Sequence, residues 1–101
     1  MLDWNNRDSL KEFAKNMARA VRDKEGRVKR LFSELSICTS PYEAKMVIAF
    51  HINRLGRHPL VKPLREILIS IPTNIKEFRY NFLPNIRFLY IFIMYYKKFD
   101  G

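Results

Sequence analysis

The sequence predicts an all-α protein, a compact bundle of five to six helices in a single domain. Apolar residues recur at helical spacing, capping and helix-breaking residues separate these stretches, and no segment shows the alternation of a strand. With 48% hydrophobic and 14% aromatic residues, the chain has enough apolar material for a packed core. We expect residues 1–7 to form a flexible tail, with Trp4 able to fold back, and residues 8–101 to form the bundle.

Two helices are expected in the first third of the chain. The first begins at Asp8 or Ser9, because Ser9 and Glu12 have the spacing of a capping box. Its apolar residues follow helical spacing: Leu10, Phe13, Ala14, Met17 and Val21. Gly26 is expected to break the chain before a second helix over residues 27–37, whose apolar face comprises Val28, Leu31, Phe32 and Leu35.

The start of the third helix is the clearest signal in the sequence. Ser40 is suited to the N-cap position. Pro41 is favoured at the first helical position, and Glu43 is favoured at the third. The helix should run to Leu55 and end at Gly56. We expect much of its apolar side to consist of Met46, Val47, Ala49, Phe50 and Leu55.

Prolines divide the rest of the chain. A fourth helix is expected over residues 60–71, with Leu64, Ile67, Leu68 and Ile71 inward, and Pro72 ends it. Thr73 can cap a fifth segment over 74–83, with Ile75, Phe78 and Phe82 inward. Pro84 then kinks the chain or opens a last helix over 85–98. We interpret its aromatic residues mainly as core, with Tyr95 and Tyr96 as exceptions, since their hydroxyls need water or a polar partner.

Positive charge is the strongest functional signal. The chain has 19 Lys and Arg against 10 Asp and Glu, a formal net charge of +9. Residues 44–65 contain no acid and five cations: Lys45, Arg54, Arg57, Lys62 and Arg65. Nucleic-acid phosphate is the commonest partner of such a patch, and the backbone N–H groups that open the fourth helix could add to it. The competing interpretation is pairing on the helices, Arg30 with Glu34 and Lys62 with Glu66.

The sequence argues against an enzyme and against a bound cofactor or metal. His51, His58 and the single Cys38 do not have the spacing of a metal site, and no glycine-rich phosphate loop or nucleophile elbow is present. RNA cleavage by the two histidines is an alternative. We find no signal peptide, and the longest apolar run, residues 86–96, is too short to span a bilayer, so we expect a cytoplasmic protein without membrane contact.

A helix-turn-helix transcriptional regulator is the other binding function that we consider. The second and third helices are joined by a short turn near residues 38–40. That turn lacks the usual glycine, and Glu43 would lie beside DNA phosphates at the tip of the recognition helix.

Three segments resemble one family when they are taken together. They are the basic amphipathic stretch 28–35, the pair of stretches 43–45 and 62–68, and the aromatic run 88–101, which ends in Tyr, Lys and a final Gly. In order and spacing they resemble the small all-helical subunit of type III CRISPR effector complexes, of the Csm kind. Lys29 stands where that family favours Arg, Tyr90 where an acid is common, and Ile48 near the place of an aromatic residue.

The resemblance implies a non-catalytic subunit that holds guide RNA paired to target RNA through backbone contacts. Its other partners would be further effector subunits and copies of itself. The matching RNA-binding positions are Lys29, Arg30 and Lys45. To these the charge distribution adds Arg54, Arg57, Lys62 and Arg65.

Overall fold

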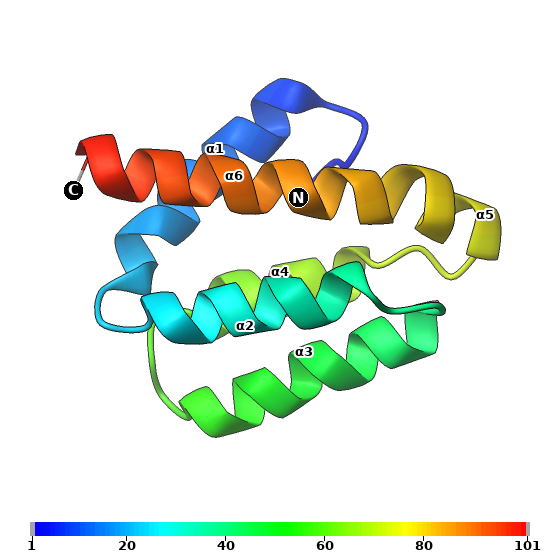
Figure 1. The fold of residues 1–101 in the computed structure, drawn as a ribbon, viewed down its shortest axis with the longest axis horizontal. Helices are drawn as coiled ribbons and strands as arrows, with labels where there is room; N and C mark the ends of the chain where they lie inside the picture. The colour runs from blue at the N-terminus through cyan, green and yellow to red at the C-terminus, as the bar shows by residue number, and fades with distance from the viewer. Residues whose placement is uncertain (1, 101) are drawn as a thin grey trace.

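Helices account for nearly all of the chain in the computed structural model, which describes the backbone of residues 2–100 and the side chains of residues 2–99. The elements are α1 (Arg7–Val21), α2 (Glu25–Ser36), α3 (Pro41–Leu55), α4 (Val61–Ser70), α5 (Ile75–Glu77), the π-helical η1 (Phe78–Phe82) and α6 (Leu83–Asp100). The last three follow one another without a break, so the chain forms five rods (Figure 1). The described residues contain no strand, and the predicted all-α bundle is confirmed.

The helices pack around one core. The long helix α6 packs on α1 and α2, and α3 packs on α2 and α4. Figure 1 shows α2 and α3 as an antiparallel hairpin, with α4 behind α2 and α1 crossing α6. The largest fully buried side chains come from all of these rods and include Leu10, Met17, Leu31, Ile48, Leu64, Phe78 and Leu89.

The segment before α1 packs against the bundle. Leu2 and Trp4 are buried, and the Trp4 ring meets Phe82 edge-on with 4.8 Å between ring centroids. The indole Nε1–H of Trp4 donates to the Ser70 carbonyl at 2.9 Å, and Asn85 Nδ2 donates to the Trp4 carbonyl at 2.8 Å. Leu2 and Trp4 therefore belong to the core, and the expected folding back of Trp4 onto the bundle is confirmed.

The first two helix boundaries differ from the predicted ones. Asn6, not Ser9, caps α1, since its side chain accepts hydrogen bonds from the backbone N–H groups of Asp8 and Ser9. Gly26 does not break the chain, because it lies in the first turn of α2. The break is at Arg22, whose φ of 48° ends α1. The prediction treated Gly26 as a helix breaker, but a single glycine is tolerated inside a helix.

The third helix begins and ends as predicted but turns a different face to the core. Ser40 Oγ accepts from the Glu43 N–H at 3.2 Å, and Gly56 has a φ of 63°. The buried residues are Ala44, Ile48, His51 and Leu55, whereas Met46, Phe50 and Ala49 are exposed. The predicted apolar side is right for Leu55, which is buried, and for Val47, which packs partly buried against the core. It is wrong for Met46, Ala49 and Phe50, because apolar residues surround α3 and a buried histidine completes its inward face.

A π-helical turn joins α5 to α6. Asn74, not Thr73, caps α5, and Ile75 is exposed although Phe78 and Phe82 are buried as predicted. The Leu83 N–H donates to the Phe78 carbonyl, five residues back. Pro84 has no N–H, and its ring crowds the carbonyl four residues before it, so a wider turn accommodates it. The chain therefore continues as one rod.

Candidate nucleic-acid interface

Three of the predicted RNA-binding residues surround one shallow depression. Arg57 comes from the connection between α3 and α4, while Lys62 and Arg65 lie about one turn apart on α4. All three are exposed and line a depression of about 680 Å³, together with His58, Glu66 and Ile69 among others. We call Arg57, Lys62 and Arg65 the cationic patch.

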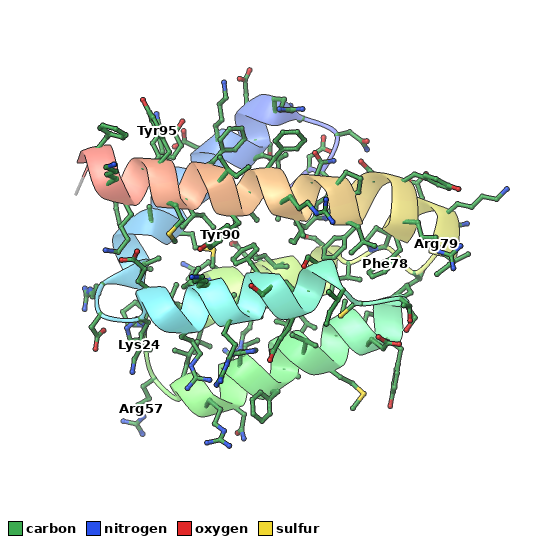
Figure 2. All side chains as sticks on the ribbon, in the orientation of Figure 1. Lys24, Arg57, Phe78, Arg79, Tyr90 and Tyr95 are labelled. Atoms are coloured by element: carbon green, nitrogen blue, oxygen red, sulfur yellow. The ribbon has the colours of Figure 1, made fainter. Side chains whose placement is uncertain are left out.

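The connection that carries Arg57 is held by His58. The Leu60 N–H donates to His58 Nδ1 at 3.1 Å, so the Nε2–H is free to donate to Asp23, which lies 3.3 Å away in the α1–α2 turn. A hydrogen bond from its own backbone N–H and the bond from His58 lower the pKa of Asp23. Figure 2 shows Lys24 and Arg57 at this shared end of the bundle.

The other four predicted cations do not join the patch. Arg54 lies over the Phe50 ring, 5.1 Å from its centroid. Lys29 lines a separate groove between α2 and α6, beside Tyr90. Arg30 is exposed and Lys45 partly buried, and neither lines either depression. Of the five cations in the acid-free stretch 44–65, the depression therefore brings together Arg57, Lys62 and Arg65, and Arg54 and Lys45 do not line it.

Nearly all Lys and Arg side chains lack a carboxylate partner among the described side chains. Within residues 2–99, Lys97 is the one Lys or Arg at ion-pairing distance from a carboxylate, with Nζ 3.1 Å from Glu25 Oε2. Neither of the helix pairs considered from the sequence forms, because Glu34 bonds to His51 instead of Arg30 and Glu66 leaves Lys62 unpaired. The positive charge of the patch is thus available to a partner.

The start of α4 offers little to an anion. The Val61 N–H donates to the His58 carbonyl at 3.0 Å, and the Leu64 N–H donates to the Leu60 carbonyl at 3.1 Å. Pro63 has no N–H, which leaves only Lys62 with an N–H open to a ligand. The expected contribution of this helix terminus to phosphate binding is therefore wrong, and the patch depends on its side chains.

A polar network around the buried His51 joins α2 to α3, and the Glu34 side chain in it stays 43% exposed. His51 has no exposed surface, and its Nε2 lies 2.7 Å from Glu34 Oε1. Arg27 Nη1 approaches Nδ1 at 3.5 Å. Because a guanidinium can only donate, Nδ1 accepts and the Nε2–H donates to Glu34. His51 is closed off from a substrate, so the two histidines do not share a site as RNA cleavage by them would require.

A second cationic surface lies where α1 crosses α6. Arg7, Lys11 and Lys15, one turn apart on α1, lie over the rings of Phe88, Phe92 and Tyr96, one turn apart on α6. The cation-to-centroid distances are 4.2, 6.0 and 5.4 Å, in that order. We call these six residues the α1–α6 seam. The four-residue spacing of the cations and that of the rings are both visible in the sequence. Only the tertiary structure places one row over the other, so the sequence analysis missed this surface.

Metal-binding groups, membrane-spanning helices and similarity to known proteins were also considered. No group of three or more His, Cys, Asp and Glu side chains that could hold a metal ion occurs in the described part of the chain. None of the described helices combines the length and apolarity needed to cross a membrane. Comparison with models of protein families, with curated proteins and with solved structures gave no match.

Proposed function

We propose that the protein is a non-catalytic RNA-binding subunit that holds RNA by its phosphates at the cationic patch. The observation that carries the proposal is a cluster of three exposed cations around one depression, none of them paired with a described carboxylate. An exposed cation without a local partner is free to neutralise a phosphate and to release its counterion.

Binding of this kind does not depend on sequence. Arginine and lysine at the patch contact phosphate oxygens, which carry no sequence information, and the major groove of an RNA duplex is too deep and narrow for side chains to read. Affinity should therefore be similar for different sequences and should fall steeply with salt.

The specific form of the proposal is a cytoplasmic subunit of a type III CRISPR effector complex. It rests on the resemblance of residues 28–35, 43–45, 62–68 and 88–101 to the small Csm-kind subunit. In that form the ligand is guide RNA paired to target RNA, and the chain contacts other effector subunits and copies of itself. Lys29, Arg30, Lys45 and Arg54 would then contact RNA or neighbouring subunits outside the patch.

Sequence-specific DNA binding has less support. A helix-turn-helix sets its two helices at about 90–120°, whereas α2 and α3 run antiparallel (Figure 1). The exposed face of α3 also presents Tyr42, Met46 and Phe50, and Glu43 lies in its first turn. Neither feature suits a recognition helix.

The test compares two charge reversals that are matched in spacing. Lys62→Glu with Arg65→Glu reverses two patch cations, and Lys76→Glu with Arg79→Glu reverses two exposed cations at the α5 end (Figure 2). The ligand is a 20-base-pair RNA duplex, measured by fluorescence anisotropy over a range of salt concentrations. We expect the patch reversal to lower the magnitude of the salt slope by about 2 and the affinity by about tenfold or more.

The control reversal should have a clearly smaller effect, and far-UV circular dichroism should show full helicity in both variants. Equal losses in the two variants would mean that net charge, not the patch, determines binding. For the CRISPR form, the tagged protein purified from its own host should retain small processed guide RNAs and several further subunits.

A further inference from the structure

We propose that the α1–α6 seam, together with Tyr95 and Phe99, is a second RNA surface that binds single strands by stacking their bases. The inference rests on the proposed RNA binding and adds a contact to bases, which the cationic patch does not make. In this surface the cations of α1 hold phosphates, and the two exposed rings near the end of α6 form the platform for bases.

The cations form a fixed row. Arg7, Lys11 and Lys15 are four residues apart, so they lie on one side of α1 with a rise of about 6 Å between successive residues. Each lies over an α6 ring, which limits the rotamers that its long side chain samples. None has a described carboxylate at ion-pairing distance. A row that is positioned in advance and still charged loses less entropy when it meets a chain of phosphates.

The platform lies beside the end of this row. Tyr95 is 55% exposed and Phe99 65% exposed, and their ring centroids are 4.8 Å apart. Tyr95 also meets Tyr96 edge-on at 5.4 Å, and Tyr96 is the ring under Lys15. Lys15, which would bind a phosphate, and Tyr95, on which a base would stack, are thus separated only by the ring of Tyr96. Figure 2 shows Tyr95 projecting from the C-terminal part of α6, near the place where α1 passes behind this helix.

A single strand fits this surface better than a duplex or a membrane. Stacking on exposed rings requires unpaired bases, since the bases of an A-form duplex are stacked on one another and closed off. An anionic lipid surface would meet the carboxylates of Asp8 and Glu12, which are exposed on α1 and directly follow Arg7 and Lys11 in the sequence. A flexible single strand can pass these carboxylates, whereas a continuous negative surface cannot.

The experiment separates base contact from phosphate contact. The probes are a 12-nucleotide RNA and an abasic strand with the same number of phosphates. The platform variant is Tyr95→Leu with Phe99→Leu, and the control is Tyr42→Leu with Tyr80→Leu, which removes two rings of similar exposure elsewhere. We expect the platform variant to bind the 12-nucleotide RNA about tenfold more weakly and the abasic strand unchanged. The control should match the unsubstituted protein on both probes.

Salt dependence provides the second readout. Loss of the rings should leave the salt slope unchanged, whereas Lys11→Gln with Lys15→Gln should lower its magnitude by about 1.4, or about 0.7 for each phosphate contact of a single strand. An equal loss on the abasic strand, or no loss on RNA, would overturn the inference. So would binding to phosphatidylserine vesicles that needs the two rings while RNA binding does not.

Failure of this inference differs from failure of the proposed function. If the protein binds duplex RNA through Lys62 and Arg65 and the platform variant behaves like the control on the single strand, only the seam is wrong. If neither RNA binds at low salt, the proposed function itself is wrong.

Discussion

The two helix pairs of the bundle treat their charged residues in opposite ways. Between α2 and α3, His51 is buried with Glu34 as its hydrogen-bond partner and with Arg27 beside its second ring nitrogen. Between α1 and α6, the cations Arg7 and Lys11 lie over aromatic rings and keep solvent access. The first pair uses charge to join two helices, and the second leaves its charge available.

The comparison shows that net charge by itself does not locate a binding surface. A cation beside a carboxylate has its charge compensated locally, so it gains little from a phosphate. A cation over a ring is held in position but is not neutralised. The partner of each cation, which only the fold determines, therefore separates structural charge from charge that can bind a ligand.

The largest effect should come from breaking the α2–α3 network. His51→Leu removes the bonding partner of Glu34 and the neighbour of Arg27, and leaves both beside an apolar side chain. We expect the free energy of unfolding to fall by about 2–3 kcal/mol. Urea unfolding followed by circular dichroism at 222 nm measures this change.

A mutant cycle shows how much of that loss comes from the pair. Glu34→Gln keeps a side-chain oxygen that can accept the Nε2–H, so it should cost less than His51→Leu. The double variant His51→Leu with Glu34→Leu should cost less than the sum of the two Leu single changes, because neither partner is left unsatisfied. Strict additivity would show that the observed contact does not stabilise the hairpin.

A smaller effect should follow from neutralising one cation of the seam. Lys15→Met keeps an unbranched apolar side chain over Tyr96 and removes the charge. We expect a stability change below about 1 kcal/mol, as for an exposed cation–π pair. The salt slope for a single-stranded RNA should fall in magnitude by about 0.7.

Lys76→Met is the matched control for this change, since Lys76 is exposed in the first turn of α5 and lies outside both cationic surfaces. It should leave the salt slope unaltered. A large loss of stability in Lys15→Met, comparable with that of His51→Leu, would mean that the seam is structural and that the contrast between the two helix pairs is wrong.

Local signals predicted the helices well, because caps and breakers act over a few residues. Ser40, Pro41 and Gly56 bound α3 as expected. The predicted inward residues of α1 and α2 are buried. The face of α3 was predicted less well, since Met46 and Phe50 are four residues apart, as are Ala44 and Ile48, and nothing local shows which pair lies inward. Hydropathy favoured Met46, Ala49 and Phe50, which are exposed, over His51, whose hydrogen-bond partner Glu34 lies 17 residues away.

The candidate site was predictable to the same extent. The acid-free stretch 44–65 identified Arg57 and Lys62 because the Gly56 turn brings neighbours together. The seam joins Lys11 to Phe92, 81 residues apart, and no local pattern reports such a contact. The aromatic residues of the last helix were interpreted mainly as core with Tyr95 and Tyr96 as exceptions; Tyr95 is 55% exposed, but so is Phe99 at 65%, which was not excepted.

The smallest effect concerns acid sensitivity, which we expect to lie more on the α2–α3 side. Glu43 accepts from the Thr39 hydroxyl at 2.7 Å and from the Thr39 N–H at 3.3 Å, and these bonds lower its pKa. A carboxylate whose pKa is lowered by folding stabilises the protein above its unfolded pKa, about 4.3 for Glu, and this contribution is lost as the pH falls through the folded value. Glu43→Gln should therefore lower the melting temperature slightly at pH 7 and leave it unchanged at about pH 2–3.

Lys11→Gln in the seam should shift the melting temperature by a similar amount at both pH values. If Glu43→Gln gives the same shift at both pH values, the Thr39 bonds do not distinguish the charged carboxylate from the neutral one.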